Sequence, residues 1–175
     1  MLNIITAEQR LNEKKGHKLV VCGPSGVGKT SLARTLDTSK TLFMDLEAGD
    51  AAIEGVAIDV IRPRTWQECR DFAVFLGGPN PSLGEEATYS QAHYEYVVQT
   101  YGDPSEVLSK YDTLFVDSIT VAGRLCFTYC TNQPECKSDR TGKLDTRAAY
   151  GMQGREMMGW LSHLQHIRDK NVVFV

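Results

Sequence analysis

One segment of the sequence fits the phosphate-binding pattern G-x-x-x-x-G-K-[ST] at every position. Its residues are Gly23, Pro24, Ser25, Gly26, Val27, Gly28, Lys29 and Thr30, followed by Ser31. Glycines let such a loop curl until its N–H groups hold phosphate oxygens, and a following helix N-terminus adds positive partial charge. We predict that residues 23–31 bind a nucleotide, with Lys29 on the β- and γ-phosphates and Thr30 on Mg²⁺. The alternative is an accidental glycine-rich turn between a strand and a helix.

Hydrolysis of a nucleotide also requires carboxylates, and two apolar runs end in them. Asp117 ends the run TLFVD, so we predict that it lies at a strand end and helps to hold Mg²⁺. The alternative is a cap on the next helix. Asp45 and Glu47 end the run TLFMDLE, and on a strand both would point to one face. We predict that Glu47 is the general base that polarises water, rather than a surface carboxylate in a turn.

A polar segment over residues 131–147, beyond the helix expected after Asp117, carries an excess of positive charge. Its four cations are Lys137, Arg140, Lys143 and Arg147, and two aspartates lie among them. This excess suits salt-sensitive phosphate contacts, whereas the lack of aromatic residues gives no support for base stacking. The alternative is a solvated loop. Arg140 or Arg147 could instead act in trans on the nucleotide of a neighbouring copy.

Several residues that resemble ligands are better explained by packing. Cys126, Cys130 and Cys136 follow a C-x₃-C-x₅-C spacing, which lacks the close pair of common zinc sites. We therefore expect the first two to share a helix face in the core, and Cys22 to lie in a buried strand. The two tryptophans, at positions 66 and 160, are expected as core or interface anchors.

Strands alternate with helices along the chain. We expect strands at 17–22, 41–46, 58–62, 112–117 and 171–175, and helices at 6–15, 31–36, 65–76, 91–101, 105–110, 118–130 and 148–170. Because the strands are nearly continuous apolar runs, we predict an α/β fold with a mostly parallel sheet covered on both faces. We interpret residues 1–175 as one nucleotide-binding domain, truncated at its C-terminus inside a core strand.

Composition limits the class of protein. The chain has 175 residues, 42% hydrophobic and 23% charged, with a net charge of -3. These values indicate a globular domain and argue against disorder. No apolar run could span a bilayer, and the N-terminus does not fit a secretory signal, so we expect a cytoplasmic protein. The pI near 5.8 argues against a globally basic surface but leaves room for a local basic groove.

Taken together, these segments resemble the RecA-like P-loop ATPase family. The resemblance rests on GPSGVGKTS, TLFMDLEAGD, DTLFVDSITVA and the final AAYGMQGREMMGWLSHLQHIRDKNVVFV, in matching order and approximate spacing over residues 18–175. The wording of ITAEQRLNEKKGHKLVVCGPSGVGKT and TLFMDLEAGDAAIEG is most similar to phage-encoded RecA-like ATP-binding proteins associated with single-strand annealing recombination. Relative to the family, residues 77–109 are longer than the core needs, which suggests an insertion.

The resemblance implies an ATPase that converts ATP and water to ADP and phosphate. It implies the roles argued above for Lys29, Thr30, Glu47 and Asp117. It also implies that residues 131–147 face DNA. It also implies a homo-oligomer that engages single-stranded DNA and an annealing protein, in the host cytoplasm if phage-encoded. ATP is favoured because no guanine-reading N/T-K-x-D motif is present. Two alternatives remain: a small-molecule kinase with a lid near Arg140, and a nucleotide-dependent switch with little turnover.

Overall fold

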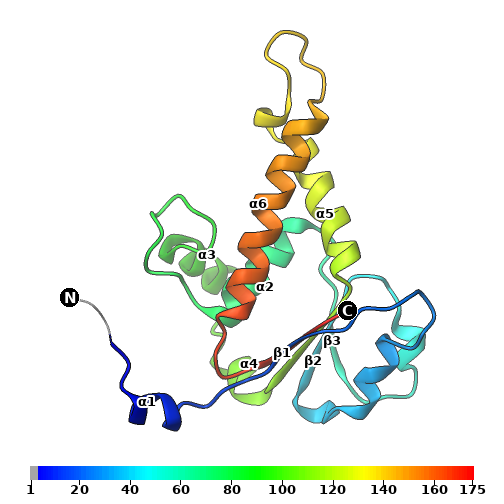
Figure 1. Ribbon diagram of the computed structural model, residues 1–175, viewed down its shortest axis with the longest axis vertical. Helices are drawn as coiled ribbons and strands as arrows, with labels where there is room; N and C mark the ends of the chain where they lie inside the picture. The colour runs from blue at the N-terminus through cyan, green and yellow to red at the C-terminus, as the bar shows by residue number, and fades with distance from the viewer. Residues whose placement is uncertain (1–3) are drawn as a thin grey trace.

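The computed structural model describes residues 4–175; residues 1–3, where the expected domain begins, lie outside the described part. Five parallel strands form one sheet in the order β1-β5-β4-β2-β3 (Figure 1). The strands are β1 (Lys18–Val20), β2 (Thr41–Asp45), β3 (Asp59–Ile61), β4 (Thr113–Asp117) and β5 (Asn171–Phe174). The predicted α/β fold with a parallel sheet is therefore confirmed.

The central strands are apolar on both faces, as the continuous hydrophobic runs predict. In β2, Leu42 and Met44 point into a large core on one face, while Phe43 points into a smaller core on the other. Phe43 stacks on Phe115 of β4, with ring centroids 5.3 Å apart. Because successive side chains alternate across a sheet, a strand buried on both faces is apolar along most of its length.

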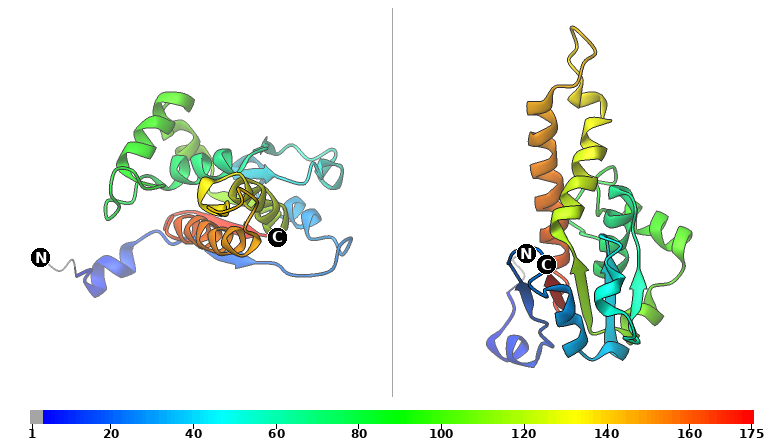
Figure 2. Two further views of the ribbon diagram at one scale, coloured as in Figure 1. Left: turned by 90° about the horizontal axis from the view of Figure 1, so that it is seen from above. Right: turned by 90° about the vertical axis from the view of Figure 1, so that its right-hand side faces the viewer.

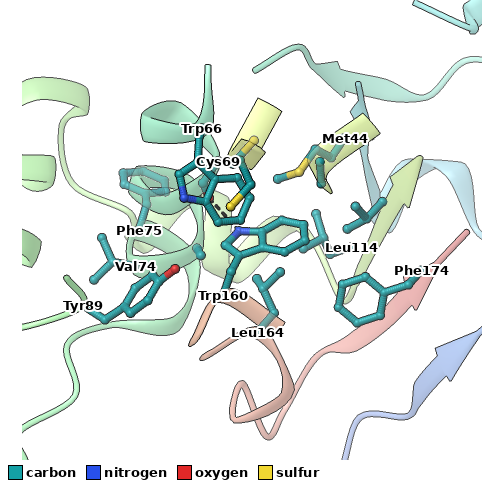
Figure 3. Packing of buried hydrophobic residues seen from close by; sticks show 14 of the residues in the cluster. Met44, Trp66, Cys69, Val74, Phe75, Tyr89, Leu114, Trp160, Leu164 and Phe174 are labelled. Carbon is teal, nitrogen blue, oxygen red and sulfur yellow. Dashed lines mark hydrogen bonds between the residues drawn. The ribbon is translucent and has the colours of Figure 1, made fainter. Parts of the chain in front are cut away.

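The larger core is covered by three helices, α2 (Trp66–Gly77), α5 (Ile119–Thr131) and α6 (Thr146–Gln165). Trp66 and Trp160 are both buried at its centre, with ring centroids 5.6 Å apart (Figure 3). The indole N–H of Trp160 donates to the carbonyl oxygen of Cys69 at 2.9 Å. Both tryptophans are thus core anchors, as predicted, and Cys126 is buried beside them.

The smaller core is covered by short 3₁₀ helices, η1 (Thr30–Thr35) and η3 (Asp50–Ile53), and a third, η2 (Thr38–Lys40), precedes β2. Ala33 and Ile53 are buried against the sheet there. The helix expected over 31–36 is therefore present, as a 3₁₀ helix over Thr30–Thr35.

Three shorter helices complete the described chain: α1 (Ala7–Asn12), α3 (Gln91–Tyr101) and α4 (Ser105–Lys110), with the 3₁₀ turn η4 (Pro134–Cys136). Capping boxes begin α1 at Thr6 and α2 at Thr65. The helix expected to reach residue 15 ends at Asn12. The helix expected over 148–170 begins earlier, because Asp145 caps it, and ends at Gln165.

The N-terminal strand differs most from the prediction. We expected residues 17–22 to be a buried strand, but β1 covers only Lys18–Val20, and Leu19 and Val20 are 52% and 65% exposed. Within the described sheet, β1 pairs only with β5 and lies at an edge. Cys22, expected to be buried, follows this strand and is exposed.

The helices α5 and α6 run side by side as an arm that projects beyond the sheet (Figures 1 and 2). The loop that joins them, with η4, lies at the far end of this arm. A helix of 13 residues such as α5 is about 20 Å long, at 1.5 Å per residue. No helix within residues 4–175 is both long and apolar enough to cross a membrane.

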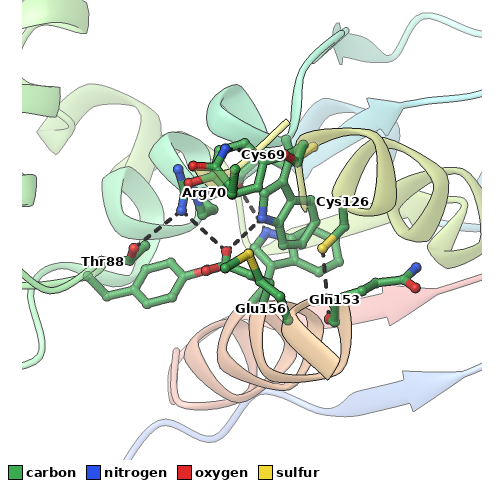
Figure 4. A network of polar contacts seen from close by, with 12 residues as sticks. Cys69, Arg70, Thr88, Cys126, Gln153 and Glu156 are labelled. Atoms are coloured by element: carbon green, nitrogen blue, oxygen red, sulfur yellow. Dashed lines mark hydrogen bonds and ion pairs between the residues drawn. The ribbon is translucent and has the colours of Figure 1, made fainter. Parts of the chain in front are cut away.

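A buried polar network ties the arm to α2 (Figure 4). Oε2 of Glu156 on α6 accepts a hydrogen bond from the Trp66 indole N–H at 2.8 Å. The same oxygen forms an ion pair with the guanidinium of Arg70 at 3.2 Å. The guanidinium of Arg70 also lies over the ring of Tyr129, 4.6 Å from its centroid. Because buried charges are costly unless paired, these contacts hold the arm in one orientation on the domain.

Candidate active site

The predicted nucleotide-binding residues meet at the carboxyl edge of the sheet, where parallel α/β proteins usually bind ligands. A cleft of about 710 Å³ opens there. It lies between the loop after β1, the segment after β2 and the first turns of α5. Glu47, Asp117 and Lys29, which are far apart in sequence, all line it. The strand order explains this, because β5 brings the end of β1 close to β4, and β4 pairs with β2.

The phosphate-binding loop has the backbone that its glycines were expected to allow. Gly26 and Gly28 have φ angles of 79° and 93°, a region that favours glycine. Nζ of Lys29 donates to the carbonyl oxygens of Gly23 and Pro24, both at 3.0 Å, so the ammonium lies over the loop. The side chain of Val27 is 63% exposed and does not line the cleft.

The last residue of the loop is joined to the β4 carboxylate. The hydroxyl of Thr30 donates to Oδ2 of Asp117 at 2.5 Å. Asp117 does not cap the next helix: Ser118 is the N-cap of α5, and its Oγ accepts from the backbone N–H of Val121 at 3.4 Å. The capping alternative for Asp117 is therefore wrong, and its carboxylate faces the threonine of the loop.

Glu47 and Asp45 have different surroundings. The hydroxyl of Ser118 donates to Oε1 of Glu47 at 2.5 Å, which holds this carboxylate in the cleft. Asp45 is buried, accepts from the backbone N–H of Gly49 at 3.1 Å and pairs with Arg62 at 3.3 Å. The expectation of a shared strand face is wrong, because β2 ends at Asp45 and the alternation does not extend to Glu47.

Two other carboxylates lie close enough to Asp117 to affect its pKa. Burial raises the pKa of Asp117, and the charges of Glu47 and Asp45 raise it further, while the Thr30 hydrogen bond and Lys29 oppose this shift. A hydroxyl and one carboxylate fit Mg²⁺, which binds few protein ligands and keeps waters and substrate phosphates. Among residues 4–175, no three His, Cys, Asp or Glu side chains form a metal-binding group.

The four predicted DNA-contacting cations lie away from the cleft. Lys137, Arg140, Lys143 and Arg147 are exposed in or beside the loop at the far end of the α5–α6 arm (Figure 2). Lys137 also closes this loop, since its Nζ donates to the carbonyl oxygen of Thr131 at 2.6 Å. The kinase alternative placed a lid near Arg140, but no residue of this loop lines the cleft of its own chain.

Two cleft residues were not singled out from the sequence. Ser118 is the hydrogen-bond partner of Glu47, and its signal was only that of a helix N-cap before an apolar helix. Arg124 lies on α5 and lines the cleft. No local motif marks it, because its place depends on how α5 leaves the sheet.

A parallel sheet with a glycine-rich phosphate loop after its first strand, and a threonine–aspartate pair at the loop's end, defines a P-loop NTPase. A family model described as an AAA domain matches residues 15–175, nearly the whole chain. The chain belongs to this AAA domain family. No curated protein and no solved structure shows significant similarity to it. Membership indicates a nucleotide-binding domain of the ATPase type, with ATP as the nucleotide.

Proposed function

We propose that this protein hydrolyses MgATP to ADP and phosphate, with Glu47 as the residue that activates water. The observation that carries the proposal is the Ser118–Glu47 hydrogen bond at 2.5 Å, in the same cleft as the Thr30–Asp117 pair. Glu47 is exposed in the turn after β2, and this hydrogen bond holds its carboxylate in the cleft. A carboxylate that lines the same cleft as the phosphate-binding loop can accept a proton from water beside the terminal phosphate.

Each residue has a distinct role in this proposal. The loop amides of residues 23–31 bind the phosphates, and Lys29 moves from its own carbonyl partners to the β- and γ-phosphates. Thr30 and Asp117 would hold Mg²⁺, which neutralises phosphate charge when bound. Glu47 orients water for in-line attack on the γ-phosphorus and accepts its proton. Ser118 positions Glu47 and does not touch the reacting atoms.

We further infer that hydrolysis is coupled to single-stranded DNA, in a RecA-like recombination or annealing protein encoded by a phage. The sequence resemblance supports this inference, as do the exposed cations at the end of the arm, Arg140, Lys143 and Arg147. The end of an arm that projects beyond the sheet can contact single-stranded DNA (Figure 1). The loop at this end does not line the cleft, so DNA bound there would leave the cleft open. An oligomer and an annealing protein partner belong to the same proposal.

The first test is phosphate release from MgATP by the purified protein, with and without single-stranded DNA, beside Glu47→Gln. We expect DNA to raise the rate. The variant should lose about 10²- to 10⁴-fold in kcat, as is typical for a general base, while ATP affinity stays within a few-fold. Normal turnover by Glu47→Gln would refute the role of Glu47. ATP binding without turnover would favour a switch, and turnover only with a small-molecule acceptor would favour a kinase.

The DNA component has its own test. The double variant Arg140→Ala/Lys143→Ala should keep basal ATP hydrolysis but weaken DNA binding. Each lost phosphate contact reduces the salt slope of single-strand affinity by about 0.7, so the slope should fall by about 1.4. The control removes two exposed cations of the N-terminal segment, Arg10→Ala/Lys15→Ala. Equal DNA binding by both double variants would refute a DNA-contacting arm.

A further inference from the structure

The cleft is lined by a basic side chain that does not belong to the phosphate-binding motif. Of the residues that line it, two are basic, Lys29 and Arg124. Arg124 lies on α5, and its side chain is exposed to the cleft and to solvent. Within residues 4–175 it makes no hydrogen bond or ion pair, so no contact within the fold accounts for its charge.

The position of Arg124 on α5 places it on the helix face that lines the cleft. Thr120 and Arg124 are four residues apart, so they share one face of the helix, and both line the cleft. Arg124 lies six positions after Ser118, which corresponds to about 9 Å along the helix axis. Helical side chains lean toward the helix N-terminus, so a long arginine side chain on this face can extend toward Ser118 and its partner Glu47.

The charges of the cleft explain why a second cation matters. Lys29 and Arg124 line the same cleft as the carboxylates of Glu47 and Asp117. Without Arg124, the two carboxylates would outweigh the single lysine, and MgATP itself remains negatively charged. A planar guanidinium binds phosphate oxygens in a bidentate manner, and an arginine at the transferred phosphate stabilises charge in the transition state.

We propose that Arg124 contacts the γ-phosphate of the nucleotide bound to its own chain, and so distinguishes ATP from ADP and accelerates hydrolysis. This inference rests on the proposed ATPase function. It assigns the role of an arginine finger to a residue in cis, in place of Arg140 or Arg147 acting on a neighbouring copy. Those two residues belong to the loop before α6 and to the first turn of α6, and this part of the chain forms the far end of the arm (Figure 2).

The test compares nucleotide affinity and turnover for the wild type, Arg124→Ala and Arg124→Lys. The control is Arg155→Ala, which removes an exposed arginine of α6 that does not line the cleft. Arg124→Ala should bind MgATP about tenfold to a hundredfold more weakly, as loss of a charged hydrogen bond predicts, and bind MgADP within about twofold of the wild type. Its kcat should fall about 10³-fold or more, with Arg124→Lys intermediate.

Mixing separates cis from trans action. Arg124→Ala and Glu47→Gln chains, combined in equal amounts, should show no recovery of hydrolysis, whereas an arginine acting between chains would restore it. Unfolding temperatures measured without nucleotide show whether each variant is folded, and the lysine variant provides a second folded probe.

Each remaining outcome has a defined meaning. If the wild type fails to bind MgATP, the proposed function fails, whatever Arg124 does. If the wild type binds and hydrolyses MgATP and Arg124→Ala matches it, the inference about Arg124 is overturned. Equal weakening of MgATP and MgADP binding would place Arg124 on the inner phosphates and overturn the γ-phosphate assignment. A loss confined to DNA-stimulated turnover would assign Arg124 to DNA and overturn it as well.

Discussion

Replacing Asp117 by asparagine should stabilise the protein without nucleotide and destabilise it relative to the wild type with MgATP. The amide keeps the shape of the side chain and an oxygen that can accept from Thr30. The hydrogen bond from Thr30 changes from charge-assisted to neutral, which should lower the free energy of unfolding by about 1 kcal/mol. The substitution also removes a buried charge beside Asp45 and Glu47, which should raise the free energy of unfolding by about 2 kcal/mol. This gain is a modest part of the usual cost of burying an ion.

The net gain of about 1 kcal/mol should raise the unfolding temperature by about 2–4 °C in a chain of this length. With MgATP at 100 times its wild-type Kd, the wild type gains about 2.7 kcal/mol from binding. If loss of the Asp117 carboxylate weakens metal-dependent binding about 100-fold, the variant gains only about 0.4 kcal/mol. The wild type should then be the more stable of the two by about 1.3 kcal/mol.

The assay is thermal unfolding of both proteins with and without MgATP, with Asp139→Asn as a control for loss of an exposed carboxylate. The control should follow the wild type in both conditions. If Asp117→Asn is less stable than the wild type without nucleotide, the argument about crowded carboxylates is refuted. If MgATP stabilises Asp117→Asn as much as the wild type, Asp117 has no part in holding the metal.

The same comparison has a definite pH dependence. Burial and neighbouring carboxylates raise the pKa of Asp117 above its ordinary value of 3.8, so the folded state holds this proton to higher pH than the unfolded state. Between those two pKa values the folded state binds more protons, and stability contributed by this group falls as pH rises. The advantage of Asp117→Asn should therefore be absent at low pH, grow through this window and then stay constant.

Two further predictions concern features outside the reacting groups. Gly16→Ala should lower the unfolding temperature by several degrees, because a Cβ at Gly16 would lie 1.8 Å from the carbonyl oxygen of Lys170, whereas Gly84→Ala, with nothing within 4 Å, should not. Equal unfolding temperatures for the two variants would contradict this packing. Cys22 should be the one thiol of five that reacts rapidly with a thiol reagent in the native protein, and MgATP should slow it, because Cys22 lines the cleft while the other four are buried. Burial also raises the pKa of Cys69 to about 12, so rapid reaction of two or more thiols would contradict the fold around them.

Much of the fold follows from patterns within short segments. The strands over β2, β4 and β5 were predictable because strands buried on both faces must be continuous apolar runs. The start of α2 was predictable from its capping box, since Thr65 and Glu68 bond to each other's backbone within one turn. The edge position of β1 was not predictable in this way, because exposure depends on which strands pair with it.

The sequence by itself determined the phosphate-binding loop, because its chemistry lies in eight consecutive residues whose glycines fix the backbone. It also predicted Asp117 and Glu47 as cleft carboxylates, since each follows an apolar strand. Only the tertiary structure decided their partners. Ser118 meets Glu47 across 71 residues because β4 lies beside β2, and Arg124 enters the cleft because α5 begins at that edge of the sheet. Contacts between distant segments depend on strand order and helix direction, and no local pattern encodes either.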